Sequence, residues 1–216
     1  QYPSMRLSLV LPAYNEANHL PRVIPELRGE LAAAAESFEI ITVDNGSTDS
    51  TEAVLQTLQH NIPELVVVRV FPNRGFSGGI RAGLEKAQGE VVGWAGADDQ
   101  LTATDIVNVY REMMRAAAPF AKGNRRFENR PSFLWFRSRV YTAFFTLFFG
   151  RLTRDAQGTP KFFRRTLYEK LHLTSRDWFI DSESIIKAGR FGVAPVERPV
   201  SWRPRSSGTS NVKIGT

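Results

Sequence analysis

The chain has 216 residues, enough for one sizeable α/β domain, and its 42% apolar and 23% charged residues are ordinary for a globular protein. It has no cysteine, which excludes disulfides and thiolate metal sites, and its three histidines lack the spacing of a zinc site. Any metal would therefore sit on oxygen ligands, which favours Mg²⁺ or Mn²⁺.

The net charge of +6 is unevenly distributed along the chain. Residues 120–165 contain eleven Lys or Arg against two acids. Such a block is typical of proteins that bind nucleic acid, an anionic membrane or a phosphorylated substrate, and it is also compatible with a solvated face. No nucleic-acid-binding motif accompanies it, so we do not expect nucleic acid as a partner.

The termini and the apolar runs bear on membrane attachment. No run reaches the 18 apolar residues of a transmembrane helix, and no signal peptide is visible. The chain stops after Thr216 without a helix or a cap, so we expect the natural protein to continue, with transmembrane helices as one possibility.

The first half alternates strands with helices. Apolar runs predict strands at 7–11, 38–43, 65–70 and 90–94, and amphipathic patterns predict helices at 18–35, 50–60, 80–88 and 104–117. Asn18 is the expected N-cap of the first helix, and residues 73–79 read as a loop. The alternation predicts a mostly parallel sheet covered by helices on both faces.

The second half is dominated by an aromatic segment. Residues 132–149 carry eight aromatics, and positions 133, 136, 140, 144 and 147 or 148 share one helical face. This pattern fits a buried core helix, an amphipathic helix lying on a membrane, or an interface with another segment or subunit. A helix at 178–190, a strand at 193–198 and a Ser/Arg/Gly loop at 201–210 follow.

Polar residues stand where ligands bind in such sheets, beyond the carboxyl ends of the strands. Tyr14 can lie along a nucleobase, and Glu16 and Asp44 can accept hydrogen bonds from a base or ribose. Asp98 and Gln100 offer two oxygen ligands to a metal that bridges a diphosphate.

Each of these residues also has a purely structural interpretation. Asp44 begins an Asp-Asn-Gly sequence that is typical of a turn. Asp98 and Asp99 can cap the next helix, and Tyr14 can be a half-buried core aromatic. The joint order of the segments along one chain is more specific than any of them alone.

That order resembles a known family. Pro-Ala-Tyr-Asn-Glu at 12–16, Val-Asp-Asn-Gly-Ser-Thr-Asp at 43–49 and Asn-Arg-Gly at 73–75 look like the nucleotide-binding signature of family 2 glycosyltransferases with the GT-A fold. The stretch D-x-Q…K-x-F-R-R at 155–165, the paired acids at 181–183 and the R-x-x-G-x-S loop at 205–210 are similar to its later motifs. The resemblance covers nearly the whole chain and is greatest to the polyprenyl-phosphate branch, which includes dolichol-phosphate mannose synthase.

The resemblance implies a fold and an activity. The fold would be α/β of the GT-A type, a mostly parallel Rossmann-like sheet flanked by helices, with a C-terminal acceptor-side region of helices and loops. Residues 1–216 would form one catalytic domain, with a nucleotide-binding half at 1–118 and an acceptor-side half at 119–216. The activity would be metal-dependent, inverting transfer of a sugar from a GDP- or UDP-sugar to a polyprenyl phosphate, at the cytoplasmic face of a membrane.

Two other activities remain open. One is transfer by a family 2 enzyme to a glycan, and the other is a nucleotide-sugar-binding domain with weak or no turnover. The base, the sugar and the oligomeric state stay undetermined.

The resemblance also assigns residues to roles. Catalysis falls to Asp98, Arg125, Arg137 and Ser138, and the metal, Mg²⁺ or Mn²⁺, to Asp98 and Gln100. The nucleotide-sugar would be held by Pro12, Tyr14, Glu16, Asp44, Asn73, Ala97, Asp98 and Arg205. The acceptor side would comprise Arg139, Asp155, Gln157, Lys161, Asp181 and Glu183.

The chain departs from the family pattern at several positions. Gly96 stands where the D-x-D motif has its first Asp, and Asp99 is an additional acid. Leu134 replaces an expected Arg, for which Arg137 can substitute. Gly-Thr-Pro at 158–160 replaces Cys-Gly-Phe, and the closing Lys is absent at 210–211. These departures indicate an unusual acceptor or sugar.

A lipid phosphate suits this residue set. A phosphate monoester has a second pKa of about 6, so it is already anionic and needs little help from a general base. It needs its charge neutralised as it approaches an anionic donor, which is a task for Arg rather than His. Arg125, Arg137 and Arg139 are the candidates.

Overall fold

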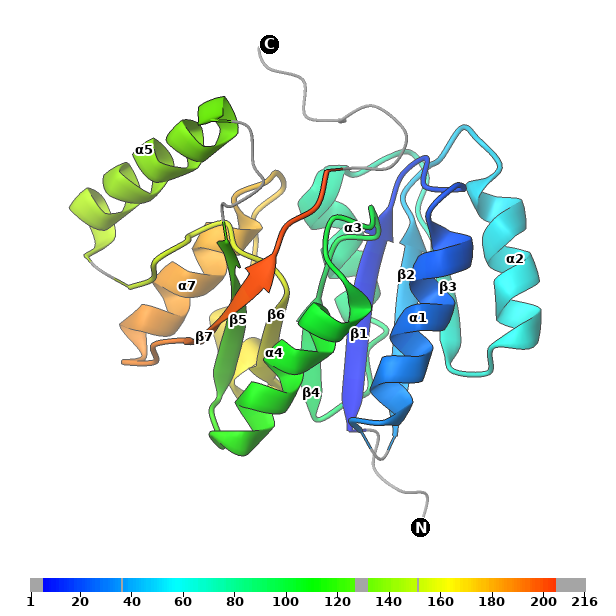
Figure 1. Ribbon diagram of the computed structural model, residues 1–216, viewed down its shortest axis with the longest axis horizontal. Helices are drawn as coiled ribbons and strands as arrows, with labels where there is room; N and C mark the ends of the chain where they lie inside the picture. The colour runs from blue at the N-terminus through cyan, green and yellow to red at the C-terminus, as the bar shows by residue number, and fades with distance from the viewer. Residues whose placement is uncertain (1–5, 36, 127–131, 151, 205–216) are drawn as a thin grey trace.

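The computed structural model describes residues 6–35, 37–126, 132–150 and 152–204 (Figure 1). Its centre is one seven-stranded sheet with the strand order β3-β2-β1-β4-β6-β5-β7. The strands are β1 (Leu7–Ala13), β2 (Phe38–Asp44), β3 (Leu65–Arg69), β4 (Val91–Trp94), β5 (Phe120–Arg126), β6 (Lys161–Arg164) and β7 (Val196–Ser201). This mostly parallel α/β sheet is the predicted fold class.

Strand direction gathers the functional loops at one edge of the sheet. The strand pairs β1–β2, β1–β4, β2–β3 and β5–β7 are parallel, whereas β6 runs antiparallel to both β4 and β5. The carboxyl ends of the six parallel strands therefore share an edge with the amino end of β6. The predicted segments that follow β1 to β4, and the one that precedes β6, all leave the sheet at this edge.

Helices cover both faces of the sheet, because alternate strand residues point to opposite sides. Leu7, Leu9 and Leu11 of β1 pack in one core with α1 (Leu20–Ala32), α2 (Thr51–Asn61) and α4 (Ala103–Arg115). Val10 of the same strand belongs to a second core on the other face. That second core includes residues of α3 (Gly75–Leu84), α5 (Ser132–Phe149), α6 (Arg165–Leu171) and α7 (Ile180–Arg190).

Several element boundaries differ from the predictions. Helix α3 begins at Gly75 rather than at 80, so most of the predicted 73–79 loop is helical. His19, not Asn18, is the residue before α1. The helix predicted at 178–190 begins at 180, and the last strand lies at 196–201 rather than 193–198. Strands β5 and β6 and helix α6 had not been predicted as elements.

Helix α5 has one packed and one outward side. Phe145 is buried in the second core, and the Tyr141 hydroxyl lies 2.8 Å from the Ser182 hydroxyl of α7. Of the expected apolar face, the described large side chains point outward, with exposed fractions of 60% for Phe136, 59% for Phe144 and 73% for Phe148. For this face the buried-core interpretation is wrong. Among the described residues, no helix combines the length and apolar character needed to cross a bilayer.

Candidate active site

The loops after β1 and β2 are tied together by short polar side chains. Asn15 has a φ of +58°, and its side-chain Oδ1 accepts a hydrogen bond from the Thr48 backbone amide at 2.8 Å. The Asn15 backbone amide donates to Ser47 Oγ at 3.0 Å. The Glu16 amide donates to Thr51 Oγ1 at 3.0 Å. These bonds fix the backbone that carries Tyr14 and Glu16 against the end of β2.

Asp44, the last residue of β2, is a turn residue with one carboxylate oxygen to spare. Its Oδ1 accepts the Ser47 amide at 3.0 Å, so the turn interpretation holds for that atom. Its Oδ2 makes no hydrogen bond to any residue that the structure describes. Glu16 is buried with its Oε2 2.6 Å from His19 Nδ1, Tyr14 is half-buried, and Pro12 pairs with Val43 in the sheet.

Asn45 holds the next loop onto this turn. Its Nδ2 donates to the Gly75 carbonyl at 2.8 Å and its Oδ1 accepts the Arg74 amide at 3.0 Å. At Gly46 the φ is +76°, and a Cβ there would lie 2.8 Å from the Asn73 nitrogen, so the contact requires glycine. The predicted nucleotide residue Asn73 therefore lies directly beside the Asp44 turn.

Residues 95–100, here called the metal loop, follow β4 and carry the predicted metal ligands. Ala97 is buried and Asp98 half-buried, and the Gln100 amide donates to Asp98 Oδ1 at 3.3 Å. A Cβ built on Gly96 would lie 2.9 Å from the same Oδ1. The Asp98 carboxylate thus leans over Gly96 and takes up space that a first aspartate of D-x-D would enter.

Asp99, the additional acid of this loop, has a structural partner. It is buried, has a φ of +57° and forms an ion pair with Arg22 of α1. Neither Asp98 nor Asp99 caps the next helix: the N-cap of α4 is Thr102, whose hydroxyl accepts the Asp105 amide at 2.9 Å. The capping interpretation of the acidic pair is therefore wrong.

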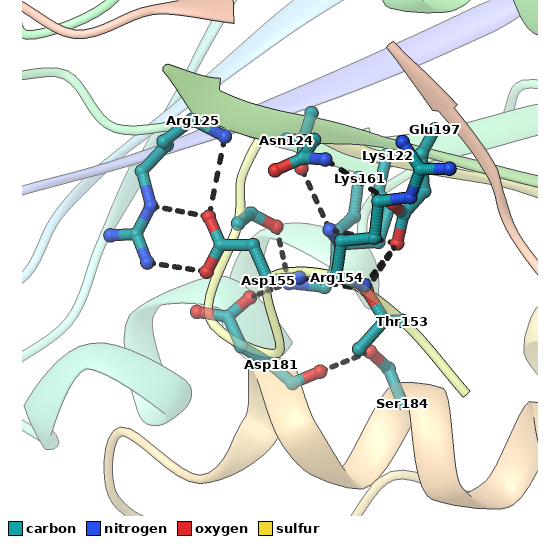
Figure 2. A network of polar contacts seen from close by, with 12 residues as sticks. Lys122, Asn124, Arg125, Thr153, Arg154, Asp155, Lys161, Asp181, Ser184 and Glu197 are labelled. Carbon is teal, nitrogen blue, oxygen red and sulfur yellow. Dashed lines mark hydrogen bonds and ion pairs between the residues drawn. The ribbon is translucent and has the colours of Figure 1, made fainter. Parts of the chain in front are cut away.

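Six charged side chains, four of them buried and two half-buried, form a cluster between β5, β6, β7 and α7 (Figure 2). Arg125 grips Asp155 with two hydrogen bonds of 2.7 Å, from Nε to Oδ2 and from Nη2 to Oδ1. Its Nη1 makes no hydrogen bond within the described part of the chain. We call this group the charge cluster; its members are Lys122, Arg125, Lys161, Asp155, Asp181 and Glu197.

The two lysines of the charge cluster are fully buried. Lys122 Nζ donates to the Gly123 carbonyl at 2.8 Å and lies 3.8 Å from Glu197 Oε1. Lys161 Nζ donates to the Gly158 carbonyl and to Asp181 Oδ1, both at 2.7 Å. Three cations facing three acids make the cluster neutral overall, which is how buried charges are tolerated.

Burial and ion pairing set the pKa values in the charge cluster. Burial alone would raise the pKa of Asp155, but the charge and hydrogen bonds of Arg125 outweigh it and hold that pKa well below its usual range. Burial lowers the pKa of Lys122 to about 8, against the opposing pull of Asp155 and Glu197. Burial likewise lowers the pKa of Lys161, although Asp181 opposes the shift.

The remaining predicted residues lie in different settings. Ser138 is buried on α5, Arg139 is exposed on the same helix, and Gln157 is half-buried in the turn after Asp155. Glu183 accepts hydrogen bonds from the Thr174 and Ser175 amides at 2.9 Å, so it closes the loop before α7. The Arg137 side chain and Arg205 lie outside the described residues.

Some residues of the site were missed by sequence reasoning. Asn45 lay inside the quoted signature but was not singled out, and only its contacts with the loop after β3 show its role. Lys122 and Glu197 were not singled out, because neither belongs to a recognisable motif. Trp94, the last residue of β4, donates its indole N–H to Asp181 Oδ1 at 3.0 Å and carried no sequence signal beyond being apolar.

Known proteins are similar to this chain in sequence and in fold. Glycosyltransferase AglD of Haloferax volcanii is 27% identical over 209 residues, covering 93% of this chain and 34% of that protein. The dolichyl-phosphate beta-glucosyltransferase of Drosophila melanogaster is 28% identical over 220 residues, covering 93% and 68%. A mannosyltransferase from Pyrobaculum calidifontis, solved with GDP-Man and Mn²⁺, superposes with a TM-score of 0.68 at 22% identity, covering 91% and 56%.

The extent of these matches defines what they show. The chain spans about a third of the first relative and about two thirds of the second. The structural match shows that the fold is that of the GT-A glycosyltransferases. The model of the family described as glycosyl transferase family 2 matches residues 8–172, well over half of the sequence. The chain therefore belongs to glycosyl transferase family 2.

Proposed function

We propose that this chain transfers a sugar from a nucleotide-sugar to a polyprenyl phosphate, with inversion at the anomeric carbon. The observation that carries the proposal is the antiparallel pairing of β4 with β6, which aligns Trp94 with Lys161. This pairing brings the metal loop and the turn of Asp155 to the same edge of the sheet. A donor on one loop and a phosphate on the other would then be neighbours. A relative named as a dolichyl-phosphate glucosyltransferase supports the acceptor class.

The donor is proposed to lie over the ends of β1, β2 and β4. The spare Oδ2 of Asp44 would accept a hydrogen bond from the nucleoside, and Tyr14 would lie along its base. The donor surface over these strand ends would also be lined by Pro12, Glu16, Asn73 and Ala97, and Arg205 would close over the diphosphate. The orientation of this donor surface is already fixed by the hydrogen bonds between the 12–16 and 44–51 loops.

The residues present fit a divalent cation that is shared with the substrate. Within the described residues no group of three or more His, Cys, Asp or Glu is placed to hold a metal. Mg²⁺ is commonly bound by one or two carboxylates together with substrate phosphates, so Asp98 with Gln100 suffices. When bound, the ion offsets negative charge on the leaving diphosphate.

The acceptor phosphate is proposed to meet Arg125. Two of its nitrogens are engaged by Asp155, which orients the guanidinium and leaves Nη1 as a donor to a phosphate oxygen. Ser138, Arg137 and Arg139 would complete the binding of the phosphate. A phosphate oxygen forms the bond to the anomeric carbon as the bond to the diphosphate breaks, which inverts the centre. No proton has to leave the nucleophile, which agrees with the buried, ion-paired state of Asp155.

Helix α5 is proposed to rest on the lipid surface that supplies the acceptor, with the domain peripheral to the cytoplasmic face. Its outward side presents Phe144, Leu147 and Phe148, with the exposed Arg139 on the same helix. Flotation with anionic liposomes tests this. Phe148→Ser should weaken binding, whereas Phe71→Ser, which removes a still more exposed aromatic beyond β3, should not. Equal flotation of all three proteins would argue against the assignment of α5.

The activity is tested by incubating the purified protein with radiolabelled GDP- and UDP-sugars, polyprenyl phosphate and Mn²⁺. Thin-layer and mass analysis should show a lipid-linked sugar. Asp98→Asn should abolish it, whereas Glu112→Gln, the same acid-to-amide change on the surface of α4, should not. Transfer to a glycan alone would shift the acceptor class. Donor binding without any turnover would identify a nucleotide-sugar-binding domain, an alternative suggested by Gly96 at the position of the first Asp of D-x-D.

A further inference from the structure

We infer that Asp181 is a positioning residue: its Oδ1 ties the metal loop to the acceptor-side turn, the segment 155–160. The inference rests on the proposed function for its catalytic consequence and on the geometry alone for the tie. Asp181 is buried in the first turn of α7. Its Oδ1 accepts from Trp94 Nε1 at 3.0 Å and from Lys161 Nζ at 2.7 Å.

The two donors are equivalent positions on neighbouring strands. Trp94 is the last residue of β4 and Lys161 the first of β6, and they are directly paired in the antiparallel register. The metal loop begins one residue after Trp94, and the acceptor-side turn ends one residue before Lys161. One carboxylate oxygen therefore holds the two strands at the point where both loops leave the sheet.

The acceptor-side turn is fixed to Lys161 as well as to the strand. The Lys161 ammonium donates to the Gly158 carbonyl at 2.7 Å, and the Gly158 amide donates to the Asp155 carbonyl at 3.1 Å. A Cβ on Gly158 would lie 2.3 Å from the Gly123 carbonyl oxygen, so the turn also packs tightly on β5. A chain of contacts thus runs from Asp181 through Lys161 to the backbone of Asp155.

The environment of Asp181 favours this role over proton transfer. A residue that removes a proton from a substrate must reach it within hydrogen-bond distance. Oδ1 is already engaged by two donors, and the charge is balanced by a fully buried ammonium. Trp94 is itself held in place by stacking on Phe163, with ring centroids 5.2 Å apart. The arrangement is that of a fixed brace between two loops.

Asp181→Asn is the variant that tests the tie, with Ser184→Ala as the matched control. Asparagine keeps the shape and an acceptor for Trp94 but removes the charge that holds Lys161. Ser184 is buried on the same helix, and within the described ranges its hydroxyl donates only to the Asp181 carbonyl, at 2.8 Å. The first measurement is amide hydrogen exchange by mass spectrometry. Asp181→Asn should speed exchange in both 95–100 and 155–160, and Ser184→Ala in neither.

The second measurement separates positioning from simple loss of structure. In the transfer assay, Asp181→Asn should lower kcat roughly 10–100-fold, the range seen when residues supporting a site are changed. The KM for the nucleotide-sugar should change less than kcat, because the metal loop is only one of the three loops proposed to hold the donor, and the loops after β1 and β2 are untouched. Ser184→Ala should keep the wild-type kcat.

The outcomes distinguish this inference from the proposed function. Faster exchange in both loops supports the tie even if no lipid-linked sugar forms, in which case only the proposed function fails. Unchanged exchange, or loosening of one loop alone, overturns the tie. A wild-type kcat in Asp181→Asn, with both loops loosened, overturns the positioning role.

Discussion

Gly83 lets α3 pack closely on the sheet, and replacing it measures the strength of that contact. A Cβ at this position would lie 2.4 Å from Val10 Cγ1 and 2.9 Å from Val43 Cγ2. Carbon atoms in contact normally stay about 3.5–4.0 Å apart, so the helix or both buried valines must move by roughly 1 Å. Overpacking of this kind typically costs about 1–3 kcal/mol.

Gly29 in α1 provides the matched control. A Cβ there would have nothing within 4 Å, so Gly29→Ala should gain the helix propensity of alanine, about 1 kcal/mol, without a steric cost. The same propensity change acts in Gly83→Ala. The stability difference between the two variants therefore isolates the packing cost, and we expect Gly83→Ala to be less stable by about 1–3 kcal/mol.

Urea denaturation followed by circular dichroism is the appropriate assay. With similar slopes, the midpoints report the difference in the free energy of unfolding directly. A midpoint for Gly83→Ala equal to that of Gly29→Ala would refute the reasoning, because it would mean that α3 can lift from the sheet without cost.

Three further predictions concern buried polar groups. Thr42→Val should raise the free energy of unfolding by about 1 kcal/mol in urea titrations. The reason is that Thr42 Oγ1 is buried and has no hydrogen-bond partner among the described residues. A variant less stable than the wild type would contradict this. Burial alone would raise the pKa of Glu183, but hydrogen bonds from Lys187, Ser175 and Thr174 lower it from 4.5 to about 2. The ionised carboxylate therefore stabilises the fold by up to about 3 kcal/mol above pH 4.5, and this stabilisation is lost as the pH falls toward 2. The stability gap between wild type and Glu183→Gln should therefore close over this range in pH-dependent unfolding, and a constant gap would contradict it. Arg125→Lys should lower the free energy of unfolding by about 1.5–3 kcal/mol and reduce sugar transfer, because lysine cannot form both hydrogen bonds to Asp155. Arg154→Lys, at the exposed position just before Asp155, should do neither.

The sequence predicted the first half of the fold well, for a simple reason. Strands 38–43 and 65–70 were each one residue from the observed bounds, because buried parallel strands are continuous apolar runs between helices. Strand β6 was missed because it has four residues, Lys-Phe-Phe-Arg, and both of its ends are charged. Its lysine, Lys161, can be buried because Asp181, which lies 20 residues later on α7, balances its charge.

Helix α3 shows the other limit of sequence reasoning. Gly75, Gly78, Gly79 and Gly83 argue against a helix on propensity alone. The structure forms one because glycine allows the backbone to approach Val10 and Pro12 more closely than any other residue would. Tertiary packing outweighs propensity here, and only the position of the neighbouring strand reveals it.

The candidate site divides along the same line. Asp44, Asp98 and Asp155 were found from local motifs, and the fold brings their loops to one edge of the sheet. Asn45, Trp94 and Glu197 act only through partners 28 to 87 residues away, with no local signal. The roles of the predicted site residues in binding and catalysis stay predictions until the variants above are made.

The neutrality of the charge cluster has an evolutionary consequence. Loss of a single member, for example Lys161, leaves an uncompensated charge in the interior, which is strongly destabilising, whereas replacing both partners by apolar residues of similar size is often tolerated. Substitutions at Lys161 and Asp181 are therefore expected to occur together across descendants of this sequence, as are those at Arg125 and Asp155. Single mutations in this cluster therefore carry a cost in stability, and we expect changes of acceptor to arise more often in α5 or in the loop after β7.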